Sequence, residues 1–308
     1  MSNLPSAHPH SKRLLLTGSS GLIGRALALR WKALGGEVIE LAHKPRGDAL
    51  TWHPENGELP ARALENIGVV VHLAGETIGQ RWSATSKKAI HDSRIFSTKL
   101  LAEKIAALPP AARPPVFICA SAIGYYGYDR PDVVDESAAP GRGFLTDVCC
   151  AWEAALTPAT AAGVRTVAAR FGVVLAKHGG ALEQMIKVFN LGMASPVGSG
   201  AQRVSWIALG DTVEALLLLI GRESLLGPVN VVSPHVCTNR ELTEMLGRIL
   251  NKTVKPAVPA FALKLMFGEL ATETMLADLA VNPRKLHEAG FVWKHGALEA
   301  ALRHELGA

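Results

Sequence analysis

A glycine-rich turn near the start of the chain constrains the fold more than any other feature of the sequence. The aliphatic run 13–17 leads into this turn, whose glycines are Gly18, Gly21 and Gly24, and residues 22–34 then carry apolar side chains at helical spacing. Gly18 allows a sharp exit from a strand, Gly21 lets a phosphate approach the backbone, and Gly24 lets helix and strand pack closely. A turn of this kind between strand and helix is typical of a nucleotide-binding α/β sheet.

Strand-like and helix-like segments alternate along most of the chain. Further apolar runs typical of strands lie at 37–41, 69–73, 116–120, 165–175 and 229–232, and helical segments at 83–107, 144–162 and 239–250. Repeated strand–helix units with right-handed crossovers predict a Rossmann-type doubly wound parallel sheet. We expect an NAD(P)-binding domain over 12–232 and a small, mostly helical C-terminal domain over 233–308, on the substrate side and partly interleaved with the first. The first eleven residues lack apolar periodicity and are expected to form a frayed end.

Charge and cysteine content narrow the class of protein. The formal net charge is +5 over 308 residues, but the Lys and Arg residues are scattered, so we expect no nucleic-acid partner and attribute the excess to a small anionic substrate or cofactor. The four cysteines show no metal-ligand spacing, and no apolar run is long enough to span a bilayer. The sequence predicts a reduced, cytoplasmic chain with no metal and no membrane partner.

The turn supplies the main contacts to the cofactor. Free N–H groups and the positive end of the helix dipole would face a pyrophosphate at the start of the helix. A turn that holds no ligand is the alternative. The predicted phosphate-binding residues are Gly18, Ser19, Ser20, Gly21, Leu22, Ile23 and Gly24.

The end of the second predicted strand decides which dinucleotide fits. An NAD-binding site usually places an acidic residue there, whereas this chain has His43, Lys44 and Arg46 after Leu41 and no acid. A guanidinium and an ammonium would pair with the 2′-phosphate of NADP(H), and Arg25 could add to the same pocket. We therefore expect NADP(H), with NAD(H) the less favoured cofactor. Placement of Lys44 and Arg46 on a solvated loop is the alternative.

Motifs along the chain resemble the extended short-chain dehydrogenase/reductase superfamily of nucleotide-sugar epimerase type. They are TGSSGLIG at 17–24, HLAG at 72–75, SAIGYYG at 121–127, DE at 135–136 and RFGVVL at 170–175. The chain is similar to an epimerase-like branch with a C-terminal domain of unknown function in HLAGETI at 72–78, DSR at 92–94, SWI at 205–207 and GPVNVVSP at 227–234. The resemblance implies hydride transfer at the nicotinamide and further cofactor contacts from Leu73, Ala74, Gly75, Ala120, Phe171 and Gly172.

The chain departs from the superfamily at the catalytic helix. Members use a Tyr and, four residues later, a Lys that lowers the pKa of the phenol, and no Tyr-x-x-x-Lys occurs in this sequence. Aligned on Glu153, the two positions fall on Leu145 and Cys149, and Cys149 is expected to be a small buried residue. The usual catalytic Ser aligns with Ala122, one place after Ser121. The standard mechanism therefore cannot be transferred.

Other residues could act in its place. Tyr125, Tyr126 and Ser121 follow the strand that faces the nicotinamide in this fold and are the candidate catalytic residues, although Tyr126 could equally be a structural aromatic. The candidate substrate contacts are Arg81, Arg94 and Trp206. Alternatively, the two arginines form structural ion pairs and the tryptophan is a residue of the hydrophobic core.

Two functions remain open from the sequence. The first is an NADP(H)-dependent oxidoreductase or epimerase-like enzyme acting on a small molecule, one that could be anionic. The second is a cofactor-binding sensor or regulatory protein with little or no turnover, which the missing Tyr and Lys favour. Members of the superfamily often form dimers, and a homodimer of this chain is expected only by analogy with them.

Overall fold

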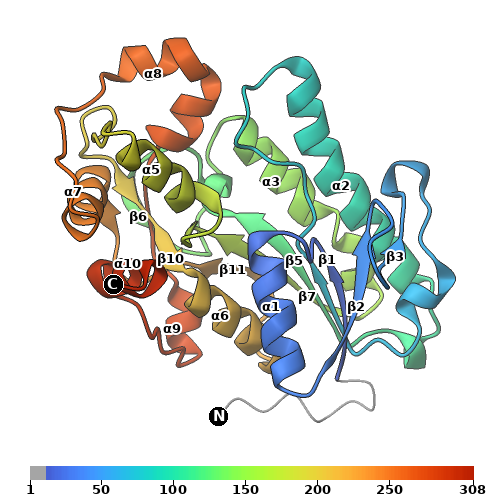
Figure 1. Cartoon of the computed structure of the whole chain (residues 1–308). Helices are drawn as coiled ribbons and strands as arrows, with labels where there is room; N and C mark the ends of the chain where they lie inside the picture. The colour runs from blue at the N-terminus through green and yellow to red at the C-terminus, as the bar shows by residue number, and fades with distance from the viewer. Residues whose placement is uncertain (1–11) are drawn as a thin grey trace.

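The computed structural model describes residues 12–308, and a seven-stranded parallel sheet forms its centre (Figure 1). The residues expected to form a frayed end lie outside the described part of the chain. The strand order is β11-β7-β5-β4-β1-β2-β3, which reverses direction at β1 and β4 as in a Rossmann sheet. The strands are β1 (Arg13–Thr17), β2 (Glu37–Ala42), β3 (Leu50–Thr51), β4 (Val69–His72), β5 (Val116–Ala122), β7 (Arg165–Phe171) and β11 (Gly227–Val231).

Helices cover both faces of this sheet, so the predicted doubly wound architecture is confirmed. Helices α1 (Leu22–Ala33) and α6 (Leu209–Gly221) contact each other on one face. Helices α2 (Ala84–Ala106), α3 (Phe144–Ala154) and α4 (Thr157–Ala161) cover the other. The apolar residues of β1 and β4 are almost completely buried, as expected for strands covered on both sides.

Two predicted elements are broken in the structure. The helix expected over 144–162 splits into α3 and α4, because Pro158 lacks an N–H and fits only the first turn of a helix. The strand expected over 165–175 splits at Gly172 into β7 and β8 (Val173–Leu175). A Cβ at Gly172 would lie 2.7 Å from the carbonyl oxygen of Ser205, so the chain leaves the sheet where only glycine fits.

Three small two-stranded sheets were not predicted, and most of their strands have only two to four residues, too few to show a period of two. They pair β8 with β10 (Trp206–Ala208), β9 (Arg203–Val204) with β12 (Cys237–Thr238), and β6 (Asp129–Val134) with β13 (Asp278–Val281). The remaining elements are helical, as expected for the C-terminal region. Those of the C-terminal region are α7 (Asn239–Ile249), α8 (Ala260–Phe267), a π-helix (Ala271–Met275), α9 (Arg284–Glu288) and α10 (Leu298–Leu306), while α5 (Gly180–Asn190) and four short 3-10 helices lie earlier in the chain.

A second hydrophobic core joins the middle of the chain to its end. Buried side chains between 175 and 208, including Trp206, pack with buried side chains between 237 and 302. The pairing of β6 with β13 connects an earlier segment, 129–134, to the C-terminal region through backbone hydrogen bonds. The C-terminal elements are therefore fixed against the sheet rather than joined to it by a linker.

Glu273 of the π-helix attaches the C-terminal region to α3. Its two carboxylate oxygens accept hydrogen bonds of 2.8 Å each from the backbone N–H groups of Phe144 and Leu145, at the start of α3. A Cβ at Gly143, which has φ +125°, would lie 2.8 Å from this carboxylate, so glycine makes room for it. Burial raises the pKa of Glu273. A residue distant in sequence thus caps α3 and satisfies two of its free amides.

Replacement of Glu273 by Ala should lower the free energy of unfolding by about 1–2 kcal/mol, because the cap is lost and two amides lose their partners. Glu269→Ala is the matched control, since Glu269 forms a more exposed ion pair with Lys87 and such pairs contribute less than about 1 kcal/mol. Urea denaturation of both variants measures the difference. Equal stabilities would show that the Glu273 cap does not hold the C-terminal region.

Candidate functional site

The glycine-rich turn presses against the end of β4. Gly18 has φ +70°, and a Cβ there would lie 2.6 Å from the carbonyl carbon of Leu73. A Cβ at Gly24 would lie 2.2 Å from the carbonyl oxygen of Gly18. Gly21 differs, since its Cβ would meet only that same oxygen at 3.2 Å. Gly18 and Gly24 are therefore required by packing, whereas the chain itself leaves nearly enough room for a methyl group at Gly21.

The first turn of α1 offers unengaged amides beside Gly21. Helix α1 begins at Leu22, no side chain caps its N-terminus, and its first turn contains no acidic residue. Ser20 is exposed at the turn, and its carbonyl oxygen accepts a hydrogen bond of 2.9 Å from Arg25. This arrangement can bind an anionic group through the N–H groups of residues such as Leu22 and Ile23 and through the helix dipole.

A buried hydrogen-bond chain fixes the segment after β4. The hydroxyl of Thr17 accepts bonds of 3.1 Å from the N–H groups of Leu73 and Ala74 and lies 2.6 Å from Nδ1 of His72. Nε2 of His72 lies 2.9 Å from the hydroxyl of Ser97 on α2. Burial lowers the pKa of His72 to about 3, so the imidazole is neutral and structural. The chain holds Leu73, Ala74 and Gly75 at the carboxyl edge of the sheet, beside the turn.

An acidic residue, Glu40, lies just before the segment 41–46, which itself contains no acid. Oε2 of Glu40 accepts hydrogen bonds from the hydroxyl of Ser19 at 2.7 Å and from the guanidinium of Arg46 at 2.5 Å. Arg46 also donates to Ser19 at 2.7 Å. Glu40 precedes the strand end by two residues and was missed because its side chain reaches back to the turn. Lys44 is exposed on the loop that follows, and its predicted contact with the cofactor stays a prediction.

A groove of about 1160 Å³ runs from this ion pair along α1 and β2. Ser19, Ser20, Arg25, Glu40 and Arg46 line its end at the turn. Its far end is lined by Arg13, which pairs with Glu37, and by Arg62 and Glu65. The end at the turn therefore combines backbone donors with two guanidinium groups.

Tyr126 is a structural residue, so its predicted catalytic role is corrected. The side chain is fully buried, and its hydroxyl donates to Oδ1 of Asn230 at 2.7 Å and accepts from Nη1 of Arg170 at 2.9 Å. Burial raises the pKa of Tyr126 to about 12. A buried phenol with both hydrogen-bonding functions engaged can neither reach a substrate nor exchange a proton near neutral pH.

Ser121 belongs to the same buried network, so its catalytic role is corrected as well. Its hydroxyl donates to Oε1 of Glu153 at 2.7 Å, and Arg170 binds both carboxylate oxygens of Glu153 at 2.7 Å. Ser121 and Arg170 are each 2% exposed. The serine therefore helps to satisfy a buried ion pair rather than facing a cleft.

Tyr125 is the remaining candidate for proton transfer. It follows β5 on a short 3-10 helix (Ile123–Tyr126), is half-buried, and has the guanidinium of Arg170 3.4 Å above the centre of its ring. Among residues 12–308 its hydroxyl has no hydrogen-bond partner. Its phenol is thus held in place by a cation–π contact and remains free to bind another molecule.

The α3 positions that align with the superfamily Tyr and Lys carry no proton-transferring group. The side chain of Leu145 packs against Gly124, at 3.2 Å from the place of a Cβ there. Cys149 is buried, as expected, and burial raises the pKa of its thiol to about 12. Neither residue can replace a phenolate or an ammonium near neutral pH.

The three residues predicted to contact substrate, Arg81, Arg94 and Trp206, differ in burial and in hydrogen-bond partners. Arg94 donates to the carbonyl oxygens of Glu76 at 3.0 Å and Ile90 at 2.9 Å, and its guanidinium lies 5.1 Å from the ring centre of Trp152. Arg94 therefore supports the segment that includes Gly75. Arg81 is exposed just before α2. Trp206 is fully buried in β10, so its predicted role as a stacking platform for substrate was wrong.

Ala120, Phe171 and Gly172 lie toward the carboxyl ends of neighbouring strands β5 and β7, at the sheet edge that also bears the turn. Parallel strands that end together form the crevice in which this type of sheet binds ligands.

Across residues 12–308, no three His, Cys, Asp or Glu side chains are grouped to hold a metal ion. The same residues include no helix with the length and hydrophobicity of a membrane span.

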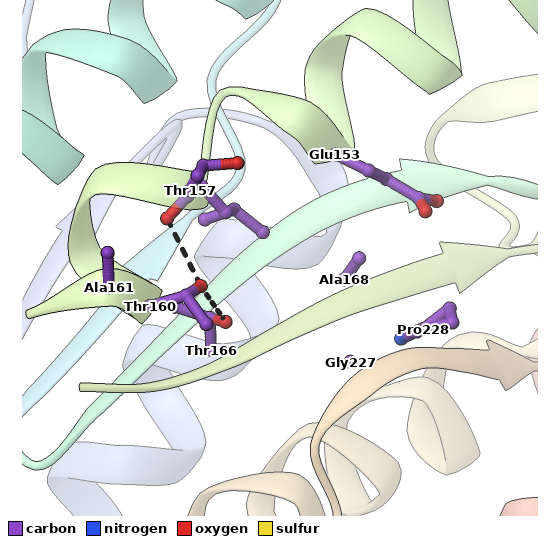
Figure 2. A pocket seen from close by; sticks show the side chains of 9 residues that line it. Glu153, Thr157, Thr160, Ala161, Thr166, Ala168, Gly227 and Pro228 are labelled. Carbon is purple, nitrogen blue, oxygen red and sulfur yellow. Dashed lines mark hydrogen bonds between the residues drawn. The ribbon is translucent and has the colours of Figure 1, made fainter. Parts of the chain in front are cut away.

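A smaller hollow of about 460 Å³ lies beside α4, β7 and β11 (Figure 2). Glu153 is at one end, and the hydroxyls of Thr160 and Thr166, 2.7 Å apart, are at the other. The carboxylate of Glu153 is already bound to Arg170 and Ser121. No residue of the glycine-rich turn lines this hollow, so the candidate site is the crevice at the turn.

Comparison with known proteins shows the family to which the chain belongs. Residues 14–253 match the NAD dependent epimerase/dehydratase family, and residues 258–305 match a domain of unknown function, DUF1731. An epimerase family protein of Mycobacterium leprae is 40% identical over 292 residues, which are 94% of each chain. The human epimerase family protein SDR39U1 is 32% identical over 295 residues, which cover 94% of this chain and 98% of that protein.

Solved structures show the same similarity in three dimensions. A crystal structure of human SDR39U1 (isoform 2) with NADPH has a TM-score of 0.86 at 30% identity, covering 96% of this chain and 99% of that chain. A nucleoside-diphosphate sugar epimerase from Corynebacterium glutamicum has a TM-score of 0.79 at 33% identity, covering 96% of this chain and 58% of that chain.

Replacement of Tyr126 by Phe should lower the free energy of unfolding by about 1–3 kcal/mol, because buried donors and acceptors on Arg170 and Asn230 lose a partner. Tyr125→Phe should change stability by less than about 0.5 kcal/mol, because its hydroxyl has no partner to lose. Thermal and urea unfolding of both variants measure the difference. A Tyr126→Phe protein as stable as the Tyr125→Phe protein would contradict the structural role of Tyr126.

Proposed function

Because the chain belongs to the NAD-dependent epimerase/dehydratase family, we propose that it is an NADP(H)-dependent oxidoreductase or epimerase-like enzyme that acts on a small molecule. The main observation that supports the proposal is the turn of Gly18, Gly21 and Gly24, in which Ser19 is hydrogen-bonded to Arg46. The four cysteines form no disulfide within residues 12–308, which is in keeping with a cytoplasmic location as part of the proposal.

The residues at the turn fit the pyrophosphate and the 2′-phosphate of NADP(H). Gly21 presents no Cβ to a phosphate, and the uncapped start of α1 supplies amide donors. Arg25 and Arg46 line the adjoining groove and would bind the phosphate on the adenosine ribose. The crystal structure of the human relative with NADPH supports the same cofactor for this chain.

The chain's own residues would orient the substrate and move a proton. When bound, the cofactor supplies or accepts hydride at C4 of its nicotinamide. Tyr125 would hydrogen-bond the reacting oxygen of the substrate through its free hydroxyl, with Arg170 holding the ring. Arg81 would attract an anionic group on the substrate, since its side chain is exposed near the start of α2. Arg94 would keep the segment after β4 in position.

A cofactor-binding sensor or regulatory protein is the second candidate. It is favoured by the helix α3, where Leu145 and Cys149 occupy the aligned catalytic positions, and by the burial of Tyr126. An enzyme of this superfamily without a phenolate–ammonium pair would need another route for its proton. Binding of NADPH without turnover on any substrate would support this second function.

The two functions are separated by incubating the purified protein with NADPH and a panel of sugar nucleotides, aldehydes and quinones. Loss of absorbance at the reduced nicotinamide band would support the enzyme. Tight binding measured by calorimetry, with stable absorbance throughout the panel, would support the sensor. Failure to bind any nicotinamide dinucleotide would contradict both.

Replacement of Gly21 by Ala should abolish measurable NADPH binding while leaving the fold intact. The new methyl group would meet only one backbone oxygen of the chain, but it would stand where a pyrophosphate must approach. Gly24→Ala is the contrasting variant, because its methyl would clash within the turn and should lower stability. Calorimetry with NADPH and thermal unfolding check both. Normal binding by the Gly21→Ala protein would remove the main support for the proposal.

Replacement of Lys44 and Arg46 together by Ala should weaken NADPH binding and leave NADH binding nearly unchanged. Each lost charge-assisted contact to the 2′-phosphate would cost roughly 1.5–3 kcal/mol. The two single variants assign the loss, and the position of Arg46 at the turn predicts that it carries the larger part. Equal weakening of both dinucleotides would show that these side chains do not bind the 2′-phosphate.

A further inference from the structure

The guanidinium of Arg94 lies at the carboxyl edge of the sheet and forms no ion pair among residues 12–308. Nη1 donates to the carbonyl oxygens of Glu76 and Ile90, whereas Nε and Nη2 donate to no atom in this range. The carboxylate of Glu76 instead accepts a hydrogen bond from the backbone N–H of Thr77. Burial lowers the pKa of Arg94, which nevertheless keeps its charge at neutral pH. A charge removed from water in this way favours a ligand that accepts its free N–H groups.

Residues of β4, of the segment that follows it and of α3 surround this guanidinium. Its Cζ lies 3.2 Å from the place of a Cβ at Gly75 and 5.1 Å from the ring centre of Trp152. Burial, and after it the charge of Arg94, lowers the pKa of His72 to about 3. Burial raises the pKa of the Cys149 thiol to about 12, and Arg94 opposes this rise only in part. Both groups are therefore neutral near pH 7, and neither balances the charge of Arg94.

Arg113 shows how a guanidinium with a purely structural role is bound in this chain. It is half-buried like Arg94, and its Nε, Nη1 and Nη2 all donate to backbone carbonyl oxygens. Arg113 precedes β5 and so lies at the amino edge of the sheet, away from the crevice. Arg94 differs in both respects, because two of its nitrogen atoms are unengaged within residues 12–308 and it lies at the edge where such sheets bind ligands.

The strand order indicates which part of a dinucleotide would meet Arg94. A Rossmann sheet binds the two halves of a dinucleotide on either side of the point where the strand order reverses, which is between β1 and β4 here. The adenosine half would lie over β1 and β2, along which the groove with Arg46 runs, and the pyrophosphate at Gly21. The other half would then lie over β4 and β5, and its ribose comes directly after the pyrophosphate. Two neighbouring ribose hydroxyls can accept two N–H groups of one guanidinium.

We propose that Arg94 binds the hydroxyl groups of the ribose next to the nicotinamide, with Nε and Nη2 as donors. From α2 it would bring a positive charge to the face of α3 where the Lys of the superfamily is absent and Cys149 takes its place. Arg94 would thus bind the cofactor, whereas the sequence led us to expect a contact with substrate. This inference rests on the proposed function, because it requires a nicotinamide dinucleotide in the crevice.

The test compares ligands that share the adenosine 2′-phosphate and differ beyond it. They are NADPH, 2′-phospho-ADP-ribose, which lacks the nicotinamide, and 2′-phospho-ADP, which also lacks the second ribose. Calorimetry measures their dissociation constants for the full chain and for Arg94→Met, whose side chain is long but uncharged. NADPH and 2′-phospho-ADP-ribose should bind about tenfold more weakly to the variant, because hydrogen bonds from a charged group are lost. The constant of 2′-phospho-ADP should change less than about twofold.

Two further variants separate ligand binding from a structural effect. Arg113→Met is the matched control: it should lower Tm, because backbone carbonyl oxygens lose their donor, while all the constants stay within about twofold. Arg94→Lys keeps the charge but cannot bind two hydroxyls at once, so the same two ligands should show a smaller loss. This variant provides the same comparison if Arg94→Met does not fold.

The pattern across the ligands decides the outcome. Equal weakening of all of them by Arg94→Met would overturn the inference and show that Arg94 only shapes the segment after β4. A loss confined to NADPH would overturn it by assigning Arg94 to the nicotinamide ring, and so would unchanged binding of every ligand. If the unchanged protein bound none of them, the proposed function itself would fail, which is a distinct result.

Discussion

The close backbone contact between the glycine-rich turn and the end of β4 determines the geometry of the whole site. Gly18 lies against Leu73 and Ala74 with no room for a Cβ, and Thr17 fixes the amides of the same two residues. The neutral, buried His72 continues this contact to α2 through Ser97. The start of α1 and the segment after β4 are therefore held as one rigid unit, which is the preorganisation that binding a pyrophosphate requires.

Helix α3, which carries the catalytic Tyr and Lys in other members of the superfamily, binds the C-terminal region in this chain. The start of α3 is capped by Glu273 from the C-terminal region, at the residue that aligns with the missing Tyr. A large polar side chain at Leu145 would have to displace its packing against Gly124. The C-terminal region is thus part of the support of α3, and under the proposed enzymatic function the proton-transferring group would come from another element. Tyr125 is the phenol at the edge of the sheet whose hydroxyl is not already engaged within residues 12–308.

Sequence patterns predicted the parts of the structure that depend on local or strongly periodic interactions. The turn, helix α1 and the fully buried central strands were predicted because each of them has a pattern that repeats over several residues. The short strands such as β9 and β13 were missed, since two to four residues carry no measurable period and pair only through tertiary contacts. The role of Tyr126 could not be predicted either, because it depends on Arg170 and Asn230, which lie far away in sequence. Glu40 was not among the predicted residues because it lies within the strand, whereas its side chain extends to Ser19 and Arg46 at the turn.

Two Arg–Glu pairs near the carboxyl edge illustrate how burial decides what a charge pair can do. Arg170 and Glu153 share two hydrogen bonds and are only 2% and 16% exposed, so separating them would leave poorly hydrated charges, at a cost of about 3–5 kcal/mol. That pair therefore stays closed and serves as the fixed support of Tyr125 and Tyr126. Arg46 and Glu40 are partly hydrated, so either side chain can exchange its partner for water or for a ligand at little cost. The same chemistry thus gives a closed support beside Tyr125 and Tyr126, and at the glycine-rich turn an arginine that can exchange its partner.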